Sequence, residues 1–88
     1  MVPGTLVRFC NESWKVPRLA LWKTKIEDHG GSEIIGYIFW YEICIVLDYI
    51  SSRYAVFHDE EILMGPEVFV LTQYGFSGWI EADALIVI

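Results

Sequence analysis

Residues 34–50, IIGYIFWYEICIVLDYI, decide the fold class because they repeat with a period of two. Every odd position from 35 to 49 carries an apolar or aromatic side chain, whereas the even positions include Glu42 and Asp48. Side chains of a β-strand alternate between its two faces, so this period indicates β structure. A strand of this length does not stay flat, and we expect either a bend across two sheets or a hairpin near Tyr41-Glu42.

The same stretch is apolar enough to raise the question of a membrane span. Glu42 and Asp48 argue against one, because a central carboxylate costs roughly 2.5–3.5 kcal/mol on insertion scales. The stretch is also shorter than the roughly 20 residues of a spanning helix, and it is rich in strand formers. We therefore interpret it as a strand and expect no membrane partner.

Other β-rich segments are separated by turn residues. The predicted strands are residues 5–9, 19–26, 53–58, 67–72 and 76–81, with a last strand from Leu85. The predicted connections are loops at 11–17 and 27–33, a loop or single helical turn at 59–65, and one tight helical turn at 82–84. No segment has a helical period, so the class is all-β. Five to seven short strands favour a small barrel, because closure hides sheet edges.

The chain has 88 residues, which make a single domain, residues 1–88. Hydrophobic residues make up 55% of it, more than a domain of this size hides easily inside one monomer. We therefore expect a protein partner or self-association into a homo-oligomer.

Charge is distributed unevenly around a net value of −6. The cations of the first 25 residues are Arg8, Lys15, Arg18, Lys23 and Lys25, and after residue 25 only Arg53 opposes eleven acids. Attraction between the two parts across a folded core explains this asymmetry, and a functional basic patch is the alternative. The acidic total argues against general binding to phosphate backbones.

The two ends of the chain carry a resemblance. Residues 3–9 (PGTLVRF), the sequence Gly78-Trp79-Ile80, and the closing Leu85 and Ile88 resemble Src-homology-3-like barrels, in particular short barrel proteins of tailed bacteriophages, including marine ones. The resemblance covers roughly a third of the chain. It implies a short 3₁₀ turn before the last strand, with residues 42–50 as the second core strand and residues 19–41 enlarging the first loop. The acidic aromatic motif for proline-rich peptides is absent from that loop, so such binding is not implied.

The sequence contains none of the familiar catalytic motifs, and we expect no enzyme activity, no catalytic residue and no cofactor. His58, Asp59, Glu60 and Glu61 are four consecutive potential ligands, and Mg²⁺ or Ca²⁺ would accept the carboxylates among them. No second group of ligands has metal-site spacing, and neighbouring strand residues point in opposite directions. We therefore expect a solvated acidic loop and no metal.

A nucleic-acid-binding surface is the second functional hypothesis. Cations and indoles alternate in the N-terminal third, as on a surface that stacks bases and attracts phosphates; the residues are Trp14, Lys15, Arg18, Trp22, Lys23 and Lys25. The alternative is a half-buried strand in which Trp22 is core and the lysines form its solvated face.

A protein interface is the first functional hypothesis. If the odd positions of residues 35–47 fill the barrel, then Ile38, Trp40 and Val46 emerge on the other face beside Glu42. At the end of the chain Ile80 and Leu85 are predicted core and Gly78 a close-packing position, which leaves residues exposed on the other side. The predicted interface is Ile38, Trp40, Val46, Trp79, Ile86 and Ile88, unless the enlarged first loop covers it.

The two cysteines and the N-terminal sequence bear on the cellular location of the protein. Cys10 and Cys44 form no Cys-x-x-Cys pair, and the N-terminal sequence lacks a basic segment followed by an apolar core. We expect a reduced, intracellular protein that is not secreted, located in the host cytoplasm or in the virion if phage-encoded. The hypothesis for function is a non-enzymatic interaction or assembly module of bacteriophage origin.

Overall fold

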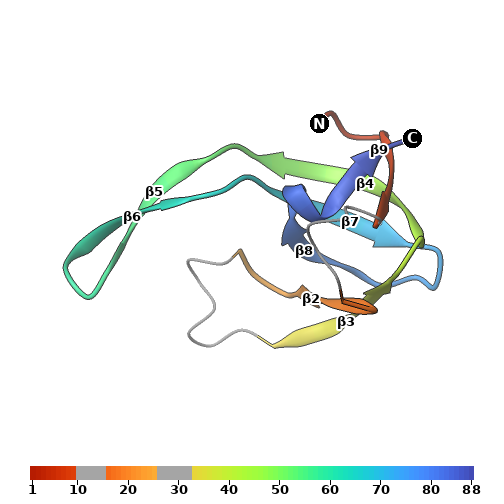
Figure 1. The fold of residues 1–88 in the computed structure, drawn as a ribbon, viewed down its shortest axis with the longest axis horizontal. Helices are drawn as coiled ribbons and strands as arrows, with labels where there is room; N and C mark the ends of the chain where they lie inside the picture. The colour runs from red at the N-terminus through yellow and green to blue at the C-terminus, as the bar shows by residue number, and fades with distance from the viewer. Residues whose placement is uncertain (10–15, 26–32) are drawn as a thin grey trace.

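The computed structural model describes residues 1–9, 16–25 and 33–88. Nine strands and one 3₁₀ helix occur in these residues (Figure 1). In chain order they are β1 Leu6–Phe9, β2 Arg18–Trp22, β3 Ile34–Phe39, β4 Ile43–Ile50, β5 Arg53–Phe57, β6 Glu60–Met64, β7 Glu67–Thr72, β8 Ser77–Glu81, η2 Ala82–Ala84 and β9 Leu85–Val87. The all-β class and the 3₁₀ turn before the last strand are confirmed.

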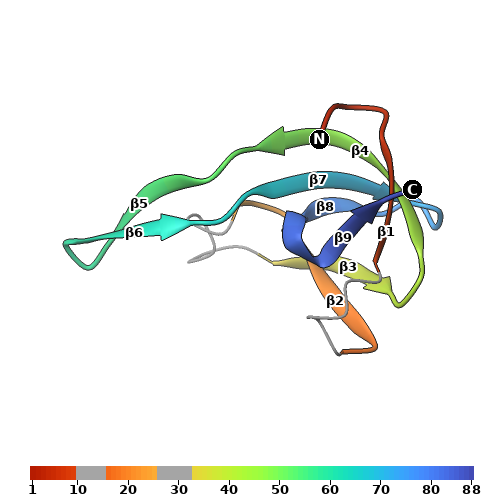
Figure 2. The ribbon, with the colours of Figure 1, turned by 45° about the horizontal axis from the view of Figure 1, so that its top comes forward.

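Seven of the strands form one antiparallel sheet in the order β3-β2-β8-β7-β4-β1-β9. The sheet curls around the core as a small barrel-like layer, and β5 and β6 leave it as a separate hairpin (Figure 2). The first core strand β1 pairs with β4, and the intervening segment adds β2 and β3 at the far edge. There are more than five to seven strands because residues 34–50 divide into β3 and β4, and residues 60–64 form the additional strand β6.

The long strand breaks at Tyr41 by a bend and not by a hairpin. β3 pairs with β2 at one edge of the sheet, whereas β4 pairs with β1 and β7 near the other. Tyr41 has a φ of 67°, an uncommon left-handed conformation for a residue with a side chain. Its N–H donates to the Phe9 carbonyl at 2.7 Å, and Phe9 N–H donates to the Glu42 carbonyl at 3.1 Å. The end of β1 therefore holds the bend in place.

The even positions from 38 to 46 face the core, so the predicted orientation is wrong. Ile38 and Val46 are fully buried, and Trp40 is half-buried and packs edge-to-face on Phe9 with 5.2 Å between ring centroids. The odd positions, expected inside, include the exposed Ile43. Both faces of this stretch are apolar, so alternation alone does not select the inner one. Pairing with β1 selects it.

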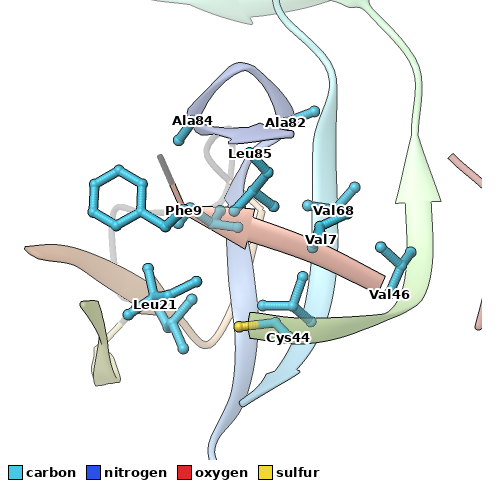
Figure 3. Packing of buried hydrophobic residues seen from close by; sticks show 12 residues of the cluster. Val7, Phe9, Leu21, Cys44, Val46, Val68, Ala82, Ala84 and Leu85 are labelled. Atoms are coloured by element: carbon cyan, nitrogen blue, oxygen red, sulfur yellow. The ribbon is translucent and has the colours of Figure 1, made fainter. Parts of the chain in front are cut away.

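The core collects small and medium apolar side chains from most strands of the large sheet (Figure 3). Val7 and Phe9 of β1 point inward with Leu21 of β2 and Val68 of β7, all fully buried. Ile80 and Leu85 also belong to the buried cluster, which confirms the prediction for both. Each buried side chain of this kind stabilises the fold by about 1.5–3 kcal/mol.

The segment after β5 was predicted as a loop or a helical turn, and this is wrong. Residues Glu60–Met64 form β6, which pairs with β5 through a two-residue turn at His58 and Asp59. Both turn residues have positive φ, 48° and 66°, as a type I′ turn requires. Asn-Gly is the usual signal for this turn, and His-Asp does not carry it. The predicted strand 19–26 likewise runs from Arg18 to Trp22, and Ile26 lies outside the described residues.

Gly78 is the point where the inserted strand β2 approaches β8. A Cβ at residue 78 would lie 2.8 Å from Leu21 Cβ and 3.1 Å from the Trp22 carbonyl oxygen. The predicted close-packing role of Gly78 is confirmed.

Gly78→Ala should therefore destabilise the protein by about 1–3 kcal/mol, because the new methyl group pushes β2 off β8. The matched control is Gly65→Ala, whose added Cβ would meet no atom within 4 Å. It should change the free energy of unfolding by less than about 1 kcal/mol. Urea unfolding of both variants measures the difference, and equal stability would contradict the close contact.

Candidate functional site

The outer face of β4, β1 and β9 is apolar and surrounds one arginine. Arg8 of β1 stands opposite Ile43 of β4 on one side and Ile86 of β9 on the other. Leu6 stands opposite Ile45, and Ile88 N–H donates to the Leu6 carbonyl at 3.1 Å. Because side chains alternate along each strand, these residues share the face away from the core. We call Leu6, Arg8, Ile43, Ile45, Ile86 and Ile88 the Arg8 face.

The guanidinium of Arg8 has one unsatisfied donor, Nε. Its Nε is buried, and no hydrogen-bond partner for it lies within the described chain. A buried donor without a partner costs about 1–3 kcal/mol, and more when it is charged. Its neighbours Leu6, Ile86 and Ile88 are exposed apolar residues. The Arg8 face therefore combines exposed apolar side chains with a cation whose Nε has no hydrogen-bond acceptor in the described part of the chain.

The β5-β6 hairpin, here called the arm, projects from the end of the molecule opposite both termini (Figure 1). Tyr54 pairs with Leu63 and Val56 pairs with Glu61, so these four side chains share one face of the arm. Tyr54, Val56 and Leu63 are 65%, 73% and 60% exposed, and Glu61 is exposed as well. We call Tyr54, Val56, Glu61 and Leu63 the arm face. An isolated two-stranded hairpin is only marginally stable by itself. The arm nevertheless leaves its apolar face exposed to water.

An ion pair anchors the base of the arm. Arg53 at the start of β5 binds the carboxylate of Glu67 at the start of β7, and its Nη1 donates to the Gly65 carbonyl at 3.0 Å. The Glu67 side chain is almost completely buried. The pair therefore ties the arm to the large sheet at the point where it leaves.

Trp79 belongs to an aromatic row on the outer face of β2, β8 and β7. It stands opposite Trp22 and stacks on Phe69 with 5.2 Å between ring centroids and 15° between ring planes. Beside this row a groove of about 160 Å³ lies between β2 and the β7-β8 pair, lined by Trp22, Trp79, Glu67 and Glu81 among others. Both carboxylates already have interaction partners. Trp79 is half-buried here and does not touch the Arg8 face.

The three described basic residues of the nucleic-acid hypothesis lie on β2 or just after it. The Arg18 guanidinium lies over the Tyr37 ring at 4.1 Å from its centroid, and Lys23 Nζ pairs with Glu33 at 3.3 Å. Lys25 is half-buried after β2. Trp14 and Lys15 lie outside the described residues. Two of the described cations thus already contact an aromatic ring or a carboxylate, and the nucleic-acid surface stays a prediction.

Two buried groups, Glu42 and Cys44, lie at the start of β4. Glu42 Oε1 accepts a hydrogen bond from the Phe39 N–H at 3.2 Å, and Oε2 is buried with no partner in the described part of the chain. Burial raises the pKa of the Cys44 thiol to about 12, and the negative charge of Glu42 adds to the shift. The thiol is therefore neutral and a poor nucleophile near pH 7.

In residues 1–9, 16–25 and 33–88, no three His, Cys, Asp or Glu side chains are grouped to hold a metal ion. No helix within those ranges is long and apolar enough to cross a membrane. Comparison with protein-family models, with curated protein sequences and with solved structures gave no match.

The predicted interface residues separate into three groups in space, and Trp79, in the aromatic row, is one of them. Ile86 and Ile88 lie on the exposed Arg8 face, whereas Ile38, Trp40 and Val46 pack in or against the core. Sequence reasoning missed Arg8 and Ile43 as members of the face, although the alternation of Val7 and Phe9 already turned Arg8 away from the core. It also missed the arm, because the β6 segment was interpreted as a loop.

Arg53→Met should lower the free energy of unfolding by about 3 kcal/mol, because it removes the cation that pairs with a buried carboxylate. The matched control is Lys23→Met, which breaks an ion pair whose two side chains are largely exposed. That change should cost less than about 1 kcal/mol. Thermal or urea unfolding measures both, and equal losses would show that the Arg53–Glu67 pair is no more important than a surface pair.

In a Cys10→Ser background, the Cys44 thiol should resist Ellman's reagent at pH 8 in the native protein and react once urea unfolds it. The folded pKa of about 12 lies above the ordinary value of 9.0. The stability that the neutral thiol contributes is thus full below pH 9 and is lost as pH rises towards 12. Rapid reaction without unfolding would contradict the buried position.

Proposed function

We propose that the protein is a non-enzymatic interaction or assembly module that binds further copies of itself. The observation that carries the proposal is the presence of two uncovered apolar surfaces, the Arg8 face and the arm face, on an 88-residue domain. Contiguous exposed apolar surface bordered by polar residues marks interaction sites in soluble proteins. Covering these surfaces removes them from water and stabilises the complex.

The edge strand β9 supports the same proposal. It is short, apolar and at the border of the large sheet, with Val87 and Ile88 about 60% exposed. Exposed hydrophobic edges favour association with another chain unless charge or proline blocks them, and β9 carries neither. The likeness of the chain ends to barrels of tailed bacteriophages is compatible with assembly in a virion or in the host cytoplasm.

A nucleic-acid-binding barrel is the second candidate. The half-buried aromatic row and the Arg18–Tyr37 contact favour it, since aromatic rings and arginine are what single strands stack on. The carboxylates of Glu67 and Glu81 beside the row oppose it. Quenching of tryptophan fluorescence by an oligonucleotide, weakened by added salt, would favour this candidate, and no binding at low salt would end it.

Ile86→Glu should shift the protein towards the monomer, because it places a charge in the middle of the Arg8 face. The expected weakening of self-association is about tenfold or more, the cost of one buried apolar side chain. The matched control is Ile34→Glu, an isoleucine of the opposite edge strand with the same 44% exposure. Light scattering across a concentration series measures both variants, and a wild-type protein that stays monomeric throughout would refute self-association.

A further inference from the structure

We infer that the Arg8 face is occupied by the arm face of a second copy, so that Glu61 of one copy meets Arg8 of the next. The inference rests on the proposed self-association and names the contact that makes it. It commits to a head-to-tail arrangement in which each copy offers its arm to one neighbour and its Arg8 face to another.

The two surfaces are complementary in chemistry. The Arg8 face has five apolar residues around one guanidinium whose Nε lacks an acceptor. The arm face has three exposed apolar residues beside one carboxylate, Glu61. A guanidinium and a carboxylate form strong, directional hydrogen bonds, and their opposite charges attract each other. Apolar surface on both partners surrounds the pair and shields it from water.

Like-with-like pairing is disfavoured by the same charges. Two Arg8 faces in contact would bring two guanidinium groups together, and two arm faces would bring two Glu61 carboxylates together. Like charges facing each other across an interface cost several kcal/mol, and they select against such pairs. The contact of arm face with Arg8 face is the combination that places opposite charges together.

The arm cannot bind the Arg8 face of its own chain, because the two surfaces lie at opposite ends of the molecule. The arm extends away from the sheet at one end, and both termini and β9 lie at the other (Figures 1 and 2). The longest dimension is 38 Å. Two different surfaces at opposite ends form a heterologous contact, which continues into a ring or an open filament.

A charge exchange tests the contact. Arg8→Glu leaves the arm intact, and Glu61→Arg leaves the Arg8 face intact. Each variant alone opposes like charges at the contact and should associate about 30-fold more weakly than wild type or worse. An equimolar mixture restores opposite charges at every contact between unlike copies, so assemblies of wild-type size should return. The double variant should assemble by itself. Sedimentation velocity measures all four samples.

Several outcomes overturn the inference while the proposed function stands. One is a Glu61→Arg variant that associates like wild type, because the arm then takes no part. Another is a mixture that stays monomeric although circular dichroism shows both variants folded. A wild-type protein that never associates refutes both the inference and the proposed function. The two failures are therefore distinguishable.

A second pair of variants covers the case in which Arg8→Glu does not fold. Ile88→Glu blocks the Arg8 face at an exposed position, and Val56→Glu blocks the arm face at another. A mixture of the two retains one working face and one working arm, and it should form a one-to-one complex that grows no further. Larger assemblies in that mixture, or none, would overturn the head-to-tail contact.

Discussion

The pairing of β1 with β4 is the constraint on which the rest of the structure depends. Val46 N–H donates to the Thr5 carbonyl at 2.9 Å, and Gly4 N–H donates to the Val46 carbonyl at 2.7 Å. Val7 then stands opposite Cys44, and both are buried. Because the register of a strand selects the face of every side chain along it, this pairing decides which half of an apolar stretch becomes core.

The residues of β1 and β4 that point away from the core form part of the Arg8 face. Turning Val7 and Phe9 inward turns Arg8 outward, between Ile43 and Ile86. The bend at Tyr41 and the ion pair of Arg53 with Glu67 then set the positions of the insertion and the arm. The protein therefore fills its core with one face of the sheet and leaves a second apolar face exposed, where the Nε of Arg8 is unsatisfied.

Several elements were readable from the sequence because they depend on local patterns. The period of two in residues 34–50 predicted β structure, and Ala82–Ala84 was predicted as a tight turn before the last strand. Gly78, Ile80 and Leu85 also took their predicted roles. Ile86 and Ile88 were predicted exposed for a simple reason: a strand in a thin layer cannot bury both of its faces.

The sequence by itself thus determined the all-β class, the tight turn before the last strand and the surplus of apolar residues, because these follow from alternation, propensity and composition. Only the tertiary structure decided that Ile38 and Val46 are core, that the Arg8 Nε has no acceptor in the described part of the chain, and that His58 and Asp59 turn the chain into an arm. The physical reason is that both faces of the central stretch are apolar. Its inner face is chosen by pairing with a strand more than thirty residues away, which no local pattern records.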